Sequence, residues 1–416
     1  MVFVWADKIV GCALIYGEER MSFTFSTAEQ IVFGSGTLKE LPAYLPASSN
    51  RCALITGTNA ERIRPVFQLL KEAGAHPAAF SLSGEPTTDR IRVLAQQARE
   101  LGCDYVVAFG GGSVLDAGKA IAALLTNKGD LFDYIEVVGK GLPLTEPAAP
   151  WIAIPTTAGT GSEVTRNAVL KVPEKKVKVS LRHASLLPRV ALIDPELMTT
   201  LSPSLTASTG MDALTHLLEA FVSGRANAFT DALCRDGLRM VSRSLVRAYL
   251  HGDDLHAREE MALASLYGGM ALANAGLGVV HGFAAAIGGS FDMPHGWVCA
   301  SLLPAACEIN IRVLREKDSK SDALKKYQEV AALLTGNLDA APEDGVEWLD
   351  TLCITLSVPS LEEFDLQPKH FPELIKKAQR ANSMKGNPIP LSDEQLSELL
   401  TMAHHSFSTG NETLYL

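Results

Sequence analysis

The sequence predicts two domains, an α/β domain with a mostly parallel sheet followed by an all-helical domain. The chain of 416 residues exceeds the usual size of one domain. Short apolar runs alternate with helical stretches up to about residue 199, and beyond about residue 200 the periodic stretches have helical spacing. We therefore place the domains at residues 21–199 and 200–416. Residues 1–20 are interpreted as an N-terminal extension, disordered rather than an added strand.

The first domain is expected to contain five strands, each a short apolar, β-branched run: Cys52–Thr56, Ala78–Leu82, Tyr105–Phe109, Trp151–Ile154 and Val190–Ile193. These runs are continuously apolar, as strands buried on both faces are. Helical spacing between them predicts three helices, at Arg62–Ala73, Arg90–Leu101 and Ser113–Leu125. This alternation indicates βαβ units and a parallel sheet.

The second domain is expected to be built from helices. Helical spacing recurs in seven segments: Met211–Val222, Asp231–Leu250, Ala257–Ala275, Ala323–Leu334, Val346–Leu352, Phe371–Ala381 and Asp393–His404. The stretch Thr199–Thr209, rich in Ser, Thr and Pro, separates the two patterns. We expect the domain boundary there.

Composition narrows the class of protein. A hydrophobic content of 47% and a net charge of −10 describe a protein with a large core and no nucleic-acid footprint. The basic cluster Lys171–Lys178 is interpreted as one basic strand or loop. Seven cysteines without a CxxC motif predict free thiols in a reducing cytoplasm. No run of eighteen apolar residues occurs, so we expect no membrane partner.

A glycine-rich loop follows the third strand. Gly110-Gly111-Gly112-Ser113 leads into a helix that carries Asp116 and Lys119. Glycines let the backbone approach a phosphate, and a helix N-terminus supplies free N–H groups. The loop matches neither GxGxxG nor a Walker A motif. The glycines alone also fit an ordinary tight turn.

A second loop, Pro155–Thr165 (PTTAGTGSEVT), follows the strand Trp151–Ile154. Its threonines, serine and glycines offer hydroxyl donors that could bind the pyrophosphate and ribose of a dinucleotide. Surface loops often have the same composition, so the loop alone leaves both interpretations open.

Taken together, GGGSVLDAGKA and IPTTAGTGSEVT resemble the iron-containing (group III) alcohol dehydrogenases. The resemblance continues through GEPT, IDPELM, STGMDALTHLLEAF, NAGLGVVHG, PHG and NP, and covers Met21 to about His404. It implies the fold shared by dehydroquinate synthase and this family. It also implies an NAD(P)-dependent alcohol dehydrogenase or aldehyde reductase with a small-molecule alcohol or aldehyde substrate. Relatives are often dimers, so we expect a homodimer or a larger homo-oligomer.

Four candidate metal ligands are scattered along the second domain. Asp212 and His216 are four residues apart, which places them on one helix face, and Glu219 continues that face. Alone, this is an ordinary i, i+4 pair; His281 alone would be a core histidine, and His295 alone a residue of a surface turn. The resemblance implies that Asp212, His216, His281 and His295 hold one divalent ion and that Glu219 is not a ligand. Fe²⁺ is the family's usual ion, and Zn²⁺ is the leading substitute.

The resemblance also implies the cofactor contacts. At the pyrophosphate and nicotinamide side it places Gly111, Gly112, Ser113 and Asp116, then Thr156, Thr157 and Thr160. It places Asn167 and Lys178 near the cofactor ribose; without the resemblance, Lys178 would be interpreted as a solvated surface lysine.

Two positions depart from the family pattern. NAD-preferring relatives carry an aspartate after the first strand, where this chain has Gly57, so NADP should be tolerated or preferred. Many relatives carry a histidine linked to proton movement where this chain has Ala285. That departure leaves the proton route open, and no catalytic residue is assigned beyond the metal site.

Two alternatives to this function remain open. One is an enzyme of another class on the same fold, a dehydroquinate-synthase-like lyase or a polyol dehydrogenase. The other is a nucleotide-binding protein that has lost catalysis, with Ala285 as the sign of decay. Absence of turnover with any alcohol or aldehyde would favour the first alternative over an alcohol dehydrogenase. Absence of bound metal, even after reconstitution, would favour the second.

Overall fold

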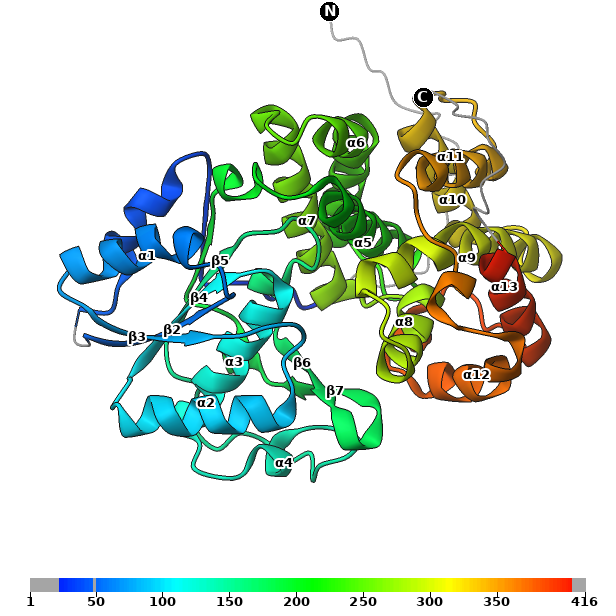
Figure 1. Ribbon diagram of the computed structural model, residues 1–416. Helices are drawn as coiled ribbons and strands as arrows, with labels where there is room; N and C mark the ends of the chain where they lie inside the picture. Colours follow the sequence, from blue (N-terminus) through cyan, green and yellow to red (C-terminus); the bar gives the residue numbers. More distant parts are fainter. Residues whose placement is uncertain (1–21, 48–49, 406–416) are drawn as a thin grey trace, which may run out of the picture.

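The computed structural model describes residues 22–47 and 50–405 (Figure 1). An α/β part formed by the first half of the chain lies beside a helical part formed by the second half. The expectation for residues 1–20 lies outside the described residues. The two-part architecture expected from the sequence is confirmed.

The α/β part is built on a six-stranded sheet with the order β1-β8-β5-β4-β2-β3. Every neighbouring pair in it is parallel. Its strands are β1 (Gln30–Phe33), β2 (Arg51–Thr56), β3 (His76–Ser81), β4 (Tyr105–Gly110), β5 (Trp151–Pro155) and β8 (Val190–Ile193). The five expected strands are confirmed within two residues at each end. The edge strand β1 was not predicted, because its four partly exposed residues do not form a doubly buried run.

Helices connect these strands: α1 (Ala60–Glu72), α2 (Thr88–Glu100), α3 (Gly112–Thr126) and the single turn α4 (Leu131–Tyr134). The side chains of Asn59 and Thr87 accept backbone hydrogen bonds that cap α1 and α2. The N-cap residue of α3 is Gly111, which has no side chain to do this. The N–H groups that open α3 are therefore available to an anion.

The basic cluster Lys171–Lys178 is neither one strand nor one loop. It spans the turn of an antiparallel hairpin between β6 (Asn167–Val172) and β7 (Val177–Arg182), which forms a separate two-stranded sheet. The hairpin was not predicted, although β6 alternates partly exposed and buried residues as a half-buried strand should.

The helical part contains α5 (Pro203–Val222), α6 (Ala228–Leu250), α7 (Leu255–Ala275), α8 (Val279–Ser290), α9 (His295–Lys317), α10 (Asp322–Thr335), α11 (Pro342–Thr355), α12 (Phe371–Arg380) and α13 (Asp393–His405). Within the described residues no strand follows β8, as expected. Short 3₁₀ helices complete the fold: η1 (Thr37–Tyr44), η2 (Ser162–Val164), η3 (Pro173–Lys175), η4 (Ala184–Leu186), η5 (Pro195–Met198), η6 (Glu362–Phe364), η7 (Pro368–His370) and η8 (Ser383–Gly386).

Three features of the helical part differ from the sequence expectation. Helix α5 begins at Pro203 and not at the expected Met211, so it starts inside the stretch Thr199–Thr209 where the domain boundary was expected; Ser202 caps it, and proline is tolerated in a first turn. Helices α8 and α9 were not predicted. Helix α9 is long and apolar enough to cross a membrane, but 89% of its apolar window is buried within the fold. Its apolar character therefore reflects a core helix.

Candidate active site

The four expected metal ligands come from three helices of the helical part. Asp212 and His216 lie one turn apart on α5, His281 lies on α8, and His295 is the first residue of α9. The Oδ1 atom of Asp212 lies 3.7 Å from Nε2 of His216. It lies 3.5 Å from Nε2 of His281 and 3.5 Å from Nε2 of His295. The structure thus brings together all four residues.

His295 does not lie in a surface turn. Pro294 is the N-cap residue of α9, and the helix starts at His295 itself. Proline adopts the backbone conformation needed ahead of a helix, which explains why a turn-like sequence begins one here. The His295 side chain is 35% exposed, whereas the side chain of Asp212 is 3% exposed. His295 therefore stands at the open side of the cluster.

The cluster has the properties of a divalent metal site. Oδ1 of Asp212 is buried and makes no hydrogen bond within the described residues, a costly state for a carboxylate unless a cation satisfies it. Despite its burial, the pKa of Asp212 is held well below its usual range by His216, His295 and His281. Burial lowers the pKa of His216 to about 4, which keeps this imidazole neutral at neutral pH. The pKa of His281, in contrast, is raised well above its usual value by Cys299, Asp212 and Glu219 in spite of its burial, so binding an ion would displace a proton from this imidazole. A buried carboxylate among imidazoles is a donor set that suits the expected divalent ion.

A fifth side chain with a metal-binding atom points into this cluster. Sγ of Cys299, one turn after His295 on α9, lies 3.7 Å from Nε2 of His281 and 3.7 Å from Nε2 of His295. Donor atoms of Asp212, His281, His295 and Cys299 all lie within 4.8 Å of one another. His216 falls outside this tightest group but stays beside Asp212. Cys299 was not singled out from the sequence, where the seven cysteines were interpreted only as free thiols.

Glu219 lies behind His281 and fixes its orientation. Its Oε2 atom lies 2.7 Å from Nδ1 of His281, and its Oε1 atom accepts a hydrogen bond of 2.7 Å from the Val280 N–H. A carboxylate at Nδ1 holds the proton on that nitrogen and leaves Nε2 free to face an ion. The expectation that Glu219 is not itself a ligand agrees with this geometry.

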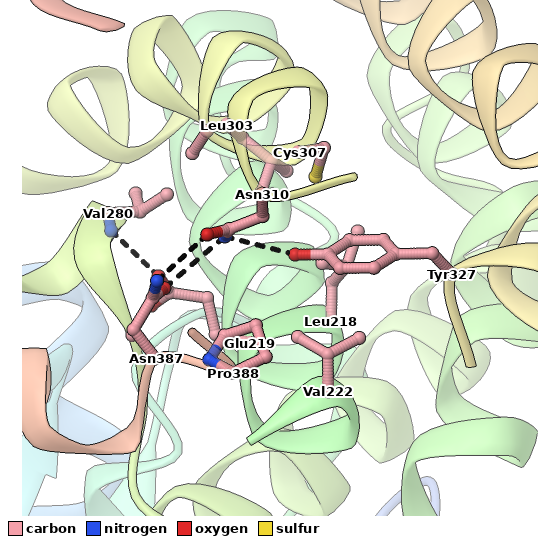
Figure 2. Close-up of a pocket in the computed structure, with 12 residues that line it drawn as sticks. Leu218, Glu219, Val222, Val280, Leu303, Cys307, Asn310, Tyr327, Asn387 and Pro388 are labelled. Atoms are coloured by element: carbon pink, nitrogen blue, oxygen red, sulfur yellow. Dashed lines mark hydrogen bonds between the residues drawn. The ribbon is translucent and has the colours of Figure 1, made fainter. Parts of the chain in front are cut away.

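Two amides support the turn that carries His281. Figure 2 shows Asn310 between Asn387 and Tyr327 in the pocket beside Glu219. Asn387 Nδ2 donates to Asn310 Oδ1 over 2.8 Å, and Asn310 Nδ2 donates to the Tyr327 hydroxyl over 3.1 Å. Asn387 Oδ1 accepts from the Val279 N–H at the start of α8. These hydrogen bonds behind the candidate ligands therefore link α8, α9, α10 and the segment before α13.

The two expected cofactor loops lie against each other at the carboxyl ends of the adjacent strands β4 and β5. A Cβ atom added to Gly112 would lie 2.6 Å from Cγ2 of Thr160, and one added to Gly111 would lie 3.2 Å from Oγ1 of Thr157. Thr156 is buried, and its N–H donates to the Gly110 carbonyl. A side chain at position 112 would therefore force the side chain of Thr160 to move.

Asp116, one of the expected cofactor contacts, makes three hydrogen bonds within the protein. Its Oδ1 atom accepts hydrogen bonds from Ser162 Oγ at 2.6 Å and Lys119 Nζ at 3.3 Å. Its Oδ2 atom accepts from the Val169 N–H at 2.9 Å. The fully buried Lys119 also donates to Thr165 Oγ1, and burial lowers the pKa of its ammonium group. Asp116 and Lys119 thus join α3, the second loop and the hairpin.

The other expected cofactor residues lie around these loops. Ser113 is in the first turn of α3, and Asn167 opens β6 with its carbonyl accepting from Lys119. Gly57 follows β2, the strand next to β4, and an added Cβ there would meet no described atom within 4 Å. Gly57 thus has room for a side chain.

Lys178 is not a solvated surface lysine. Its side chain is 9% exposed, and its ammonium group pairs with Glu85. A Cβ atom added to Gly288 on α8 would lie 2.7 Å from Nζ of Lys178. Lys178 therefore reaches from the hairpin to the helix that carries His281.

Ala285 lies one turn after His281 on α8 and is exposed. Residues four apart share one helix face, so this exposed methyl group stands on the side of α8 that carries the candidate ligand. The position has no polar group that could take up a proton.

Comparison with known proteins identifies the family. Residues 28–195 match the iron-containing alcohol dehydrogenase model, and residues 206–404 match the C-terminal model of the Fe-containing alcohol dehydrogenase family. Alcohol dehydrogenase 4 of Saccharomyces cerevisiae is 36% identical over 380 residues, covering 89% of this chain and 96% of the relative. The NAD-dependent methanol dehydrogenase of Bacillus methanolicus is 32% identical over 389 residues, covering 89% and 97%. A crystal structure of a 1,3-propanediol oxidoreductase superposes with a TM-score of 0.84 at 32% identity, covering 92% of this chain and all of the other. The chain therefore belongs to the iron-containing alcohol dehydrogenase family.

Proposed function

We propose that this chain interconverts a small alcohol and its aldehyde or ketone, with a divalent metal held by Asp212, His216, His281 and His295. A nicotinamide cofactor bound beside the metal site would accept a hydride from the carbinol carbon of the substrate, or donate one in the reverse direction. The observation that carries the proposal is the buried, unbonded Oδ1 atom of Asp212, which three imidazole nitrogens face. A bound divalent ion supplies Lewis-acid polarisation of the substrate oxygen.

The chain's own residues supply position and charge. Asp212 provides the one negative charge among the four proposed ligands, and Glu219 holds His281 with Nε2 facing the cluster. The partly exposed His295 marks the side from which substrate reaches the site. Bringing the carbonyl carbon and the nicotinamide into contact accounts for much of the rate in such a transfer.

For the cofactor, we propose that the uncapped start of α3 receives the pyrophosphate and that Thr157 and Thr160 line the same site. The support is the close packing of the two loops, which leaves Gly111 and Gly112 beside these threonines. Because Gly57 provides no carboxylate to repel a 2′-phosphate, NADP is accepted as well as NAD.

The remaining assignments follow from family membership and composition. We propose Fe²⁺ as the native ion with Zn²⁺ as a substitute, a homodimer or larger homo-oligomer, and a cytoplasmic location. The relatives act on alcohols as different as methanol and 1,3-propanediol by name, so the substrate class is set no more finely than a small alcohol or aldehyde.

The decisive experiment is a panel of alcohols and aldehydes assayed by nicotinamide absorbance, with NAD(H) and NADP(H), on protein of defined Fe²⁺ or Zn²⁺ content. We expect turnover that disappears on chelation and returns when metal is added. Stoichiometric metal without turnover on any substrate would contradict the dehydrogenase assignment and favour another chemistry on this fold. Failure to bind metal at all would favour the decayed nucleotide-binding protein, against which the complete donor set argues.

A further inference from the structure

We propose that Cys299 supplies a fifth, sulfur donor to the metal ion; this inference rests on the metal site of the proposed function. Its Sγ atom lies 3.7 Å from Nε2 of His281 and 3.7 Å from Nε2 of His295. The same two nitrogens lie 3.5 Å from Oδ1 of Asp212. The sulfur therefore faces the point on which the proposed ligands converge.

The separations are those of atoms that share one ion. Two donors bound to one five-coordinate ion at about 2.0–2.3 Å, with an angle of about 90–120° between them, lie roughly 2.8–4.0 Å apart. The separations of 3.5 Å and 3.7 Å fall within this range. Since donor atoms of all four residues lie within 4.8 Å of one another, one ion can contact Cys299 together with Asp212, His281 and His295.

The surroundings of the thiol differ from those of a packing cysteine. Cys299 is fully buried, but its sulfur contacts two imidazole nitrogens, and the carboxylate oxygen beside them has no hydrogen bond. That buried, unpartnered oxygen of Asp212 independently indicates that a cation belongs at this point. A cysteine that only fills apolar space would make no contact with the donor atoms of the proposed ligands.

The backbone explains how the sulfur reaches the ion. His295 and Cys299 lie four residues apart on α9, as Asp212 and His216 do on α5. Residues with this spacing share one helix face. Each of these two helices therefore carries a pair of candidate donors on one face, and α8 adds His281.

Binding through sulfur changes the charge and the selectivity of the site. The thiol releases its proton to solvent as the sulfur–metal bond forms. The thiolate and Asp212 together then balance the two charges of the ion, with the imidazoles neutral. A sulfur donor favours Zn²⁺, Co²⁺ and Fe²⁺ over Mg²⁺ and Mn²⁺, which prefer oxygen.

X-ray absorption at the zinc edge of the zinc-loaded full chain tests the proposal directly. We expect one sulfur scatterer per zinc at about 2.3 Å beside nitrogen and oxygen scatterers at about 2.0–2.2 Å. Bound zinc with a nitrogen and oxygen shell alone would overturn the role of Cys299 while leaving the metal site standing. Absence of bound zinc would overturn the metal site and this proposal together.

Variants then assign the sulfur. Cys299→Ser should lose the sulfur shell, and its Co²⁺-loaded form should lose the near-ultraviolet thiolate-to-cobalt absorption of the unsubstituted protein. Cys307→Ser is the matched control, because Cys307 is a buried thiol on the same helix and lies outside the donor cluster. It should retain both signals, and loss of the sulfur shell in Cys307→Ser alone would contradict the assignment. If Cys299→Ser does not fold or bind metal, the presence or absence of a sulfur shell in the zinc-loaded, unsubstituted protein together with Cys307→Ser still tests the proposal.

Discussion

Replacing Glu219 with glutamine should weaken metal binding although the residue does not reach the metal. The Glu219 carboxylate lies 2.7 Å from Nδ1 of His281 and accepts the Val280 N–H at 2.7 Å. A glutamine can keep one of these bonds through its oxygen, but its amide nitrogen then faces another donor. Hydrogen bonds to charged groups contribute about 1.5–3 kcal/mol, and removal of an outer-shell partner typically costs 10–100-fold in metal affinity. We therefore expect Zn²⁺ to dissociate about 10–100-fold more readily, a loss of about 1.4–2.8 kcal/mol.

Competition with a chromophoric chelator measures the Zn²⁺ affinity of the purified chain and of Glu219→Gln. Thermal unfolding with and without Zn²⁺ provides a second measurement, because a ligand bound by the folded state raises its stability in proportion to its affinity. Glu347→Gln, at an exposed position on α11, serves as the control and should match the unsubstituted chain. If the affinity of Glu219→Gln stays within about twofold, the contact with His281 does not prepare the site and the reasoning fails.

Three further predictions concern Gly57 and the two expected cofactor loops. Gly112→Ala should raise the dissociation constant for NADH by about tenfold or more, because the new Cβ would lie 2.6 Å from Cγ2 of Thr160; unchanged NADH fluorescence titrations would contradict this. Gly57→Asp has space for its side chain and should lower kcat/KM with NADP relative to NAD by about tenfold or more; a constant ratio would remove Gly57 from cofactor selection. Burial raises the pKa of Glu163 to about 7, so the folded state binds its proton more tightly than the unfolded state, and Glu163 reduces stability as pH rises from about 4.5 to 7. Glu163→Gln should cancel up to about 3 kcal/mol of that fall, checked by urea unfolding at both ends of the range; equal pH slopes in both proteins would contradict it.

The sheet was predictable because its strands carry their own signal. Continuous apolar runs that alternate with helical segments are typical of a parallel sheet whose two faces are both covered by helices. The edge strand β1 and the hairpin β6–β7 lack that signal. Strand β1 is short and partly exposed, and the hairpin has buried residues separated by partly exposed ones, with several lysines at its turn. In the α/β part, the missed strands are those that are not buried on both faces.

The helical part shows where sequence periodicity stops being informative. Helix α8 is buried at ten of its twelve positions, so it has almost no polar face to mark a helical period. Helix α9 is similarly apolar, and its start is hidden in a turn-like proline and glycine pair. His281 and His295 lie on these two helices, and for that reason resemblance to the family was needed to join them to Asp212 and His216.

Cys299 is a different kind of omission. Convergence of α5, α8 and α9 on one point depends on tertiary packing and is invisible in the sequence, but the pairing of His295 with Cys299 is local. The spacing is the same four residues that placed Asp212 and His216 on one face of α5. Had Pro294 been interpreted as the residue before a helix, the same rule would have placed the thiol beside an expected ligand. Because α9 was not predicted, both the true setting of His295 and the proposed fifth donor to the metal were missed.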